Sequence, residues 1–306
     1  MPSHLNRHRI VRTASAVTLA LGTGLAAPFL LAGTATAAAP EATAAFSTSD
    51  HSIVYTAAAG QTNKVTVRAS KSEGSEGSEE ITYVIDDGVA INAGEGCSYP
   101  DSADRTKVSC TVATLETQDP YATLQLALGD GDDTFAYDNA TDQTYYFASA
   151  DLGVGKDTAT HTGGVDGNSV LGGAGDDDLT VGEAGVVLGG DGSDTLHAAS
   201  GSIAQGGNNN DTINAEGEEA AVDGGAGNDV IQGGAERQNL SGGDGNDTIR
   251  AGVGDDFVYG GKGNDTLYGN SGNDTMYGNS GDDKLYGGTG QDALSGGPGT
   301  NVVRQD

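Results

Sequence analysis

The C-terminal part of the chain repeats with a period of nine residues. From Gly224 onward nine units follow one another without a spacer, among them GGDGNDTIR, GGKGNDTLY and GNSGDDKLY. Their shared template is Gly-Gly-x-Gly-x-Asp-x-U-x, in which U is apolar. A fixed period of this kind indicates a solenoid, because a single unit cannot bury its apolar face and must stack on its neighbours.

The template divides each unit into a turn and a strand. Glycines at positions one, two and four permit the positive φ angles of a tight turn. Positions seven to nine then read as a three-residue strand in which only U points inward, which gives a thin apolar core. The predicted core residues are Ile231, Leu240, Ile249, Val258, Leu267, Met276, Leu285, Leu294 and Val303.

The aspartate at position six lies where the turn enters the strand. Stacked turns would therefore place these carboxylates above one another at a spacing of about 4.8 Å. Such a column repels itself unless a cation lies between its members. Carboxylate and carbonyl oxygens are hard ligands, and a flexible set of six or more suits Ca²⁺ better than Mg²⁺.

The nonapeptide template resembles the calcium-binding repeat of the RTX family. The resemblance implies an all-β fold, a right-handed parallel β-roll or β-solenoid, with two units in each coil. It also implies that each Ca²⁺ ion takes carbonyl oxygens from the glycine turns above and below it. We expect a small β domain to precede the roll and to cap its first coil, because a solenoid end otherwise exposes an unpaired sheet edge.

Two units per coil would sort the position-six residues into two columns, here called the long column and the short column. Asp133, in the early unit LGDGDDTFA, is a further candidate ligand. The short column holds Asn168, Ala220 and Gln238 before Asp256, Asp274 and Asp292. The long column holds Asp157, Asp177, Asp194, Asp211, Asp229, Asp247, Asp265 and Asp283, and ends at Asn301. The gaps between aspartates predict about seven sites on the long column and about two on the short one, roughly nine Ca²⁺ ions in total.

Residues 1–37 have the pattern of a secretory signal peptide. Arg7, Arg9 and Arg12 precede an apolar stretch from Ala14 to Leu31, and an Ala-Thr-Ala cleavage motif ends at residue 37. A retained anchor helix is the alternative, but glycines and a proline interrupt the apolar stretch. We therefore expect a secreted, extracellular protein that does not insert into a membrane.

The remaining N-terminal part reads as a leader and a small domain. Residues 38–50 are rich in Ala, Thr and Ser and are expected to form a flexible leader. Short alternating runs separated by turn residues predict an all-β domain over residues 51–127, and the roll follows over residues 128–306. Cys97 and Cys110 are an even pair in an exported chain, so a disulfide between them is expected, with two free thiols as the alternative.

Composition limits the classes of partner. The formal net charge is −30, from 44 acidic and 14 basic side chains, which is unsuited to nucleic acid. Without a ligand the Asp-, Gly- and Asn-rich tract has the composition of a disordered chain. Calcium binding is therefore expected to be part of the folding free energy.

The favoured function is a calcium-binding β-roll without catalysis, monomeric, with a structural, adhesive or matrix-associated role. A polysaccharide or cell-surface partner is left open, since Tyr259, Tyr268, Tyr277 and Tyr286 repeat at position nine. The alternative is an accessory module of a secreted hydrolase, but the sequence has no HExxH or GxSxG motif. A pore-forming toxin would need a long apolar segment after the signal. An ice-binding face would need a uniform rank of residues at position three, where this chain has mixed, charged ones.

Overall fold

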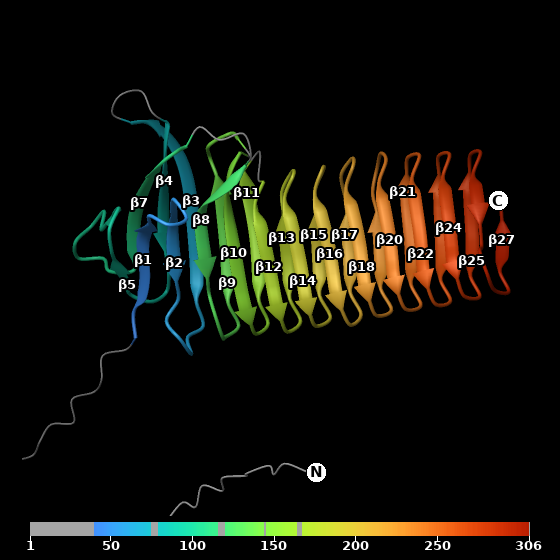
Figure 1. The fold of residues 1–306 in the computed structure, drawn as a ribbon, viewed down its shortest axis with the longest axis horizontal. Coiled ribbons are helices and arrows are strands. Elements are labelled where there is room, and N and C mark those ends of the chain that lie inside the picture. The colour runs from blue at the N-terminus through green and yellow to red at the C-terminus, as the bar shows by residue number, and fades with distance from the viewer. Residues whose placement is uncertain (1–39, 75–78, 116–119, 144, 164–166, 306) are drawn as a thin grey trace, which may run out of the picture. The chain divides into compact units, whose positions relative to one another are not determined.

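The computed structural model describes residues 40–74, 79–115, 120–143, 145–163 and 167–305, all of which belong to one compact unit. The predicted signal peptide lies outside these residues. All the regular structure in the described residues is β-strand, and the strands lie side by side along one axis (Figure 1). No helix long and apolar enough to cross a membrane occurs in the described ranges.

The strands form two sheets. The 13-stranded sheet contains β1 (Ala42–Ser47), β2 (Ser52–Thr56), β5 (Ile91–Ala93), β8 (Tyr121–Ala127), β10 (Tyr146–Val154), β12 (Ser169–Ala174), β14 (Val186–Asp191), β16 (Ile203–Asn208), β18 (Ala221–Ala226), β20 (Asn239–Asp244), β22 (Phe257–Lys262), β24 (Thr275–Ser280) and β26 (Ala293–Ser295). The 14-stranded sheet contains β3 (Lys64–Glu73), β4 (Glu79–Asp86), β6 (Cys97–Ser98), β7 (Lys107–Ala113), β9 (Thr134–Asn139), β11 (Thr158–Gly163), β13 (Asp178–Val181), β15 (Thr195–Ala198), β17 (Thr212–Ala215), β19 (Val230–Gly233), β21 (Thr248–Val253), β23 (Thr266–Ser271), β25 (Lys284–Thr289) and β27 (Val302–Arg304).

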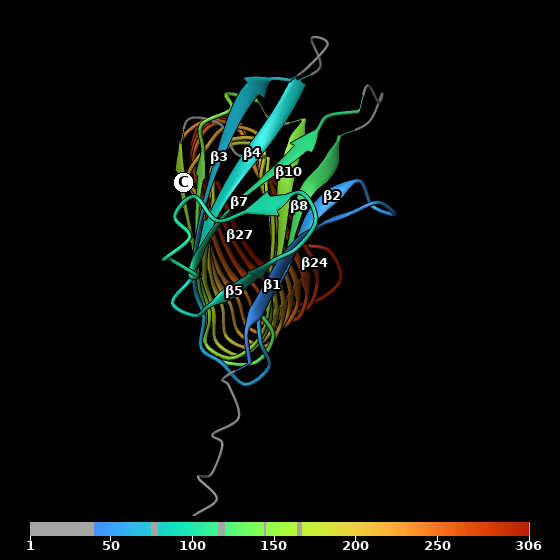
Figure 2. The ribbon, with the colours of Figure 1, turned by 90° about the vertical axis from the view of Figure 1, so that its left-hand side faces the viewer.

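From β8 onward the chain alternates between the two sheets, and each strand pairs in parallel with the next but one. Leu240 is paired with Val258 in one sheet, and Ile249 with Leu267 in the other. Seen from the end at which β1 lies, the coils lie behind one another (Figure 2). The prediction of a parallel β-roll with two units in each coil is confirmed.

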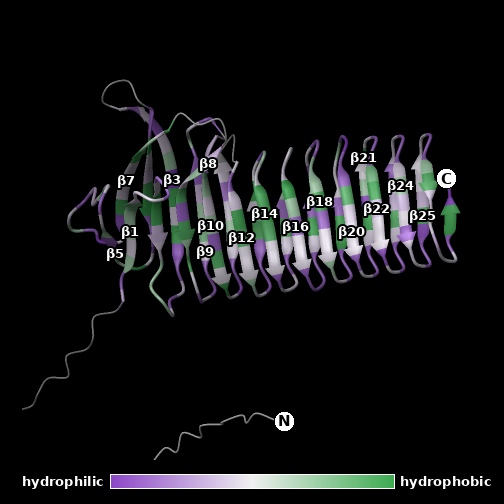
Figure 3. Ribbon diagram, viewed as in Figure 1, coloured by the Kyte–Doolittle hydropathy of each residue, from purple (hydrophilic) through white to green (hydrophobic). Residues whose placement is uncertain are grey.

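The strands of the roll are longer than the three residues predicted. Most run over six residues, from position seven of one unit through position three of the next. Two positions in each strand therefore point inward, as Ile249 and Ala251 do in β21. The residues at positions one to three thus belong to the strand as well as to the turn, which the template alone did not indicate. The apolar residues lie in the strands, and the turns at both edges are hydrophilic (Figure 3).

Seven of the nine predicted core residues are fully buried, and the last two are not. Leu294 is partly buried and Val303 is 47% exposed. They belong to β26 and β27, which are the last strands of their sheets. No further coil in the described residues covers them, so the prediction is wrong at the C-terminal end.

The N-terminal strands continue the same two sheets. β2 pairs in parallel with β8, and β3 pairs in parallel with β9, so the apolar core runs from the N-terminal strands into the roll. The prediction of a flexible leader is wrong for residues 42–47, which form β1. This strand pairs antiparallel with β2 and buries Ala42 and Ala44. Small side chains on alternate positions suffice there, because β2 supplies the backbone hydrogen bonds.

The predicted disulfide between Cys97 and Cys110 is present and joins β6 to β7.

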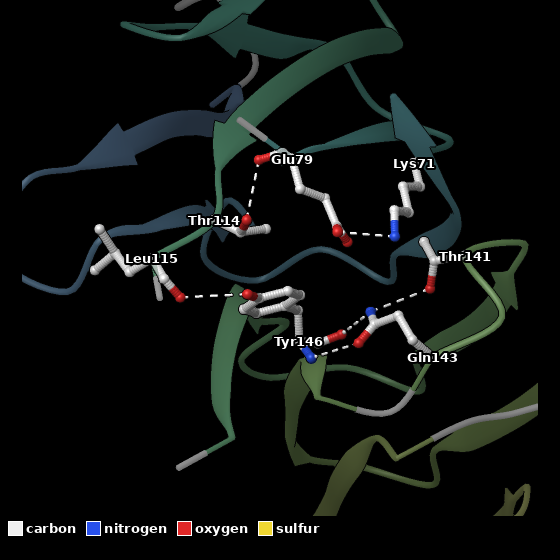
Figure 4. A network of polar contacts seen from close by, with 7 residues as sticks. All are labelled: Lys71, Glu79, Thr114, Leu115, Thr141, Gln143 and Tyr146. Carbon is white, nitrogen blue, oxygen red and sulfur yellow. Dashed lines mark hydrogen bonds and ion pairs between the residues drawn. The ribbon is translucent and has the colours of Figure 1, made fainter. Parts of the chain in front are cut away.

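The irregular segment before β10 is held by local hydrogen bonds (Figure 4). The Gln143 amide donates to Thr141 Oγ1 and accepts from the Tyr146 backbone N–H, and the Tyr146 hydroxyl donates to the Leu115 carbonyl. The Tyr146 ring also lies edge-on to the Tyr121 ring of β8, with centroids 5.4 Å apart.

Candidate metal centre

The long column lies at the turns that lead into the odd-numbered strands, and its order is as predicted. Each aspartate accepts, through Oδ1, a hydrogen bond from the backbone N–H of the column residue one coil earlier. The distances are 2.8 Å from Asp229 N to Asp247 Oδ1 and 2.9 Å from Asp247 N to Asp265 Oδ1. The same bond links Asp133, Asp157, Asp177, Asp194, Asp211, Asp229, Asp247, Asp265, Asp283 and Asn301 in turn.

The second oxygen of each of these aspartates is the distinctive feature of the column. In the nine aspartates from Asp133 to Asp283, Oδ2 is buried and has no hydrogen-bond partner among the residues that the structure describes. The side chains are at most 2% exposed. An ionised carboxylate buried without a partner costs several kcal/mol, so native proteins avoid it unless a cation compensates the charge.

Burial also changes the protonation of the column in the absence of a cation. Loss of hydration raises the pKa of Asp177, Asp211 and Asp247 to about 7, and that of Asp133 and Asp265 to about 6. Neighbouring carboxylates raise these pKa values further, and the accepted backbone hydrogen bonds lower them. Protons and cations therefore compete for the same oxygens.

The glycine turns bring backbone carbonyls to the same place. Gly245, at position four, has a φ of 146°, and a Cβ there would lie 1.5 Å from the Gly227 carbonyl oxygen of the preceding coil. Only glycine allows this approach. Asn209, which replaces a position-four glycine, keeps the turn with a φ of 81°. Carboxylate and carbonyl oxygens thus converge along the edge.

This donor set fits Ca²⁺. All of its atoms are oxygens, and a hard cation would itself be the partner that the buried Oδ2 atoms lack among the described residues. Within the described ranges no group of three or more His, Cys, Asp or Glu side chains could hold a metal ion by itself. Each ion would therefore need main-chain carbonyls beside the aspartates, as a Ca²⁺ site in a glycine turn allows.

The short column has the same geometry only near the C-terminus. Asp256 and Asp274 each accept a backbone N–H through Oδ1 and keep a buried Oδ2 without a partner in the described part of the chain. Burial raises the pKa of Asp256 to about 6. Asp292 differs from the other candidates, because its Oδ2 accepts a hydrogen bond from Gln305 Nε2 and the side chain is only partly buried.

Earlier in the short column, side-chain hydrogen bonds close the turns. Gln238 is 1% exposed, and its Nε2 donates to the carbonyls of Gly217 and Ala235. These two carbonyls belong to neighbouring coils, so one amide group bridges them. One coil before Ala220, Ser202 donates its hydroxyl to the Gly182 carbonyl.

The residues at position five form a second ladder, which the sequence reasoning missed. Asn228 Oδ1 accepts the backbone N–H of Asn246, and Asn246 Oδ1 accepts that of Asn264. In this ladder the later coil donates to the earlier one, whereas in the aspartate column the earlier coil donates to the later one. The signal was available, since Asn or Asp occupies position five in most of the regular units.

The tyrosines at position nine stack in two pairs. Ring centroids are 5.5 Å apart for Tyr259 and Tyr277 and 5.1 Å apart for Tyr268 and Tyr286. Arg250 lies over the Tyr268 ring at 5.0 Å. Such stacks stabilise neighbouring strands, and Tyr277 is 39% exposed.

Comparison with known proteins agrees with the geometry. The RTX calcium-binding nonapeptide repeat family matches four segments, residues 186–202, 221–237, 233–267 and 268–303. Within residues 186–303 the β-roll is thus built from segments whose sequences are similar to RTX calcium-binding repeats. No curated protein matches the chain. The X-ray structure of a hyperactive, Ca²⁺-dependent, β-helical antifreeze protein from an Antarctic bacterium matches with 20% identity and a TM-score of 0.33, covering 63% of this chain and 78% of that one.

Proposed function

We propose that this protein is secreted and folds when it binds extracellular Ca²⁺, and that it then serves as a structural, adhesive or matrix-associated rod. In this proposal the aspartates of both columns, twelve including Asp292, share roughly nine Ca²⁺ ions with the turn carbonyls. The protein is a monomer and has no catalytic centre.

One observation carries the proposal. Eleven aspartates in the described residues bury an Oδ2 atom without a partner, nine on the long edge and two on the short edge. A fold that buries this many unpaired oxygens needs a ligand that compensates them in register with the coils. Divalent calcium, shared between successive carboxylates, does so with one ion per gap.

The N-terminal strands would supply the other requirement of a roll, a covered end. We propose that residues 51–127, with the Cys97–Cys110 disulfide, form the cap of the roll over residues 128–306. The antiparallel strands β4 and β7 support this role, since they follow β3 at the end of the 14-stranded sheet. Export through the N-terminal signal would keep the roll unfolded until it meets millimolar calcium, the level that extracellular calcium modules sense.

Equilibrium dialysis of the metal-free protein against Ca²⁺, with Mg²⁺ in a parallel series, tests the proposal. We expect roughly nine bound Ca²⁺ ions per chain at millimolar concentration, and few bound Mg²⁺ ions, since Mg²⁺ sheds its water reluctantly. A chain that remains free of Ca²⁺ at several millimolar would contradict the proposal.

A further inference from the structure

The first turn of the long edge is not a nonapeptide repeat. Residues 57–63, AAAGQTN, precede β3, and β3 pairs in parallel with β9 so that Lys64 is opposite Thr134. Asn63 therefore stands one coil before Asp133. Its backbone N–H donates to Asp133 Oδ1 at 2.6 Å, which is the bond that links every later step of the column. The long column begins at Asn63.

The side chain of Asn63 presents an oxygen with no partner. Its Nδ2 donates to Asp87 Oδ2 at 2.8 Å, and a flipped amide would set two oxygens against each other. The amide oxygen is therefore Oδ1, which is buried and unpartnered among the described residues, in a residue that is 1% exposed. Asp133 Oδ2 is in the same condition one coil further along.

Asp87 fixes this arrangement without being a ligand itself. Its two carboxylate oxygens accept hydrogen bonds from the Tyr55 hydroxyl, the Asn63 amide and the backbone N–H groups of Lys64 and Gly88. Both oxygens are thus saturated. Asp87 holds the Asn63 amide so that Oδ1 remains available.

The backbone of this turn matches that of the repeats. A Cβ on Gly131 would lie 2.6 Å from the Gln61 carbonyl oxygen. A Cβ on a position-four glycine of the repeats would likewise approach the carbonyl oxygen one coil earlier. The Gly60 N–H donates to Asp130 Oδ1 and ties the two turns together. Gln61 Nε2 donates to the Pro40 carbonyl, which leaves Gln61 Oε1 buried without a partner in the part of the chain described.

The geometry points to an additional Ca²⁺ site between the turn of residues 57–63 and the turn of residues 128–133. Asn63 Oδ1 and Asp133 Oδ2 are its side-chain ligands, and main-chain carbonyls of the Gln61 type complete it. The inference rests on the proposed function, because it extends the same column. It means that calcium joins the N-terminal strands to the roll, and that the N-terminal strands are a part of the metal-binding structure.

The opposite end of the column provides a natural control. Asn301 also accepts a backbone N–H through Oδ1, from Asp283. Its Nδ2, however, donates to the Gly297 carbonyl within its own turn. At this end the amide nitrogen is thus hydrogen-bonded to a carbonyl of the turn, whereas the Asn63 nitrogen is hydrogen-bonded to Asp87. The two asparagines end the column in different ways, and only Asn63 offers an oxygen to a cation.

The test counts Ca²⁺ by equilibrium dialysis in the full chain and in the variants Asn63→Leu, Asn63→Asp and Asn301→Leu. We expect Asn63→Leu to bind one ion fewer than the wild type and Asn301→Leu to bind the same number. Asn63→Asp is made together with Asp87→Asn, so that an amide group at position 87 can donate to the new carboxylate in place of the lost Asn63 donor. This pair keeps an oxygen at the site and makes it a charged ligand, so it should keep the full number and lower the calcium midpoint of folding. An unchanged count in folded Asn63→Leu overturns the inference.

Folding of each variant is checked by far-UV circular dichroism in calcium. If Asn63→Leu does not fold, the Asn63→Asp, Asp87→Asn pair decides, and an unchanged or higher calcium midpoint in that pair contradicts the site. A different result would reject the proposed function, namely a wild-type protein that binds no Ca²⁺. A wild type that binds many ions, with Asn63 variants that behave like it, rejects the additional site alone.

Discussion

The two edges of the roll enclose one core but close their turns by different means. On the long edge an aspartate with a buried, unpartnered oxygen stands in every coil from Asp133 to Asp283. In the middle of the short edge, Gln238 and Ser202 donate hydrogen bonds to turn carbonyls. The comparison shows that a solenoid needs each turn closed, and that a cation or a donor side chain can do so.

Coil length varies within the part of the short edge that lacks aspartates, since Ala204 and Val222 are paired 18 residues apart. Where the short edge is tight, as between Val187 and Ala204, paired strands are 17 residues apart, and they are 18 apart from Leu240 to Val258. The short turns are closed by backbone bonds such as Ser202 N to the Ala199 carbonyl. The coil from Ala204 to Val222 keeps 18 residues with Ala220 in the column, so the absence of an aspartate allows the shorter coil without requiring it.

Loss of ligands on the long edge should have the largest effect. Asp229→Ala with Asp247→Ala removes two adjacent column members and disrupts the three gaps that they form with each other and with Asp211 and Asp265, so we expect about three fewer bound ions. Each lost site should lower the free energy of unfolding by about 3 kcal/mol when Ca²⁺ is at a hundred times its Kd. Dialysis and thermal unfolding in calcium measure both quantities. A double variant with the wild-type ion count would contradict the metal role of this edge.

Gln238→Ala is the matched change on the short edge. It should leave the ion count unchanged. Gln238 Oε1 is buried without a partner among the described residues, but Nε2 is already hydrogen-bonded to the turn carbonyls that an ion would need, as at Asn301. It should still lower the free energy of unfolding by about 1 to 3 kcal/mol, since the Gly217 and Ala235 carbonyls lose their donor. The same dialysis and unfolding measurements apply. A reduced ion count here would erase the difference between the edges.

Gln238→Asp should sharpen the comparison by extending the short column. The new carboxylate would lie one coil before Asp256, whose Oδ1 already accepts the residue 238 N–H. We expect one additional Ca²⁺ site and a stronger dependence of stability on calcium than in the wild type. Calorimetric titration of the variant and of the wild type with Ca²⁺ measures the gain. Identical isotherms would mean that an aspartate at position 238 does not create a Ca²⁺ site in this turn.

The dependence of stability on pH should reverse with calcium. Burial raises the pKa of Asp177, Asp211 and Asp247 to about 7 in the metal-free fold, above the value of about 4 for an exposed aspartate. The metal-free fold thus binds more protons than the unfolded chain, and it loses stability as the pH rises from about 4 through 7. With Ca²⁺ the carboxylates are ionised, so stability should rise over that range.

The folded fraction between pH 4 and pH 8, measured by far-UV circular dichroism on metal-free protein and in millimolar calcium, checks this reversal. A folded fraction that follows one curve in both conditions would show that the carboxylates do not bind the ion.

Reduction of the Cys97–Cys110 disulfide should have the smallest effect on the edges. The bond joins β6 and β7 and takes no part in either column. We expect a loss of about 3 kcal/mol in the N-terminal strands by the loop-entropy argument, with the ion count of the repeats retained. Dialysis after reduction checks this, and a complete loss of calcium binding would contradict the separation.

The sequence predicts the column well because its period fixes the register. Once two units form a coil, Asp229 can only stack on Asp247. The sequence fails where a residue acts outside the template. Gln238 is an eroded position in the pattern, and only the structure shows its amide bridging two coils. Asn63 lies in a turn with no repeat around it, and its place in the column depends on the long-range pairing of β3 with β9.

A calcium titration of the metal-free protein, followed by far-UV circular dichroism with Mg²⁺ as control, tests whether the roll needs the ion in order to fold. We predict a cooperative rise of β signal with Ca²⁺ and none with Mg²⁺, because the buried oxygens of the columns need a cation before the coils can stack. A fully folded spectrum at neutral pH after exhaustive chelation would contradict it, since the turns would then close without the ion.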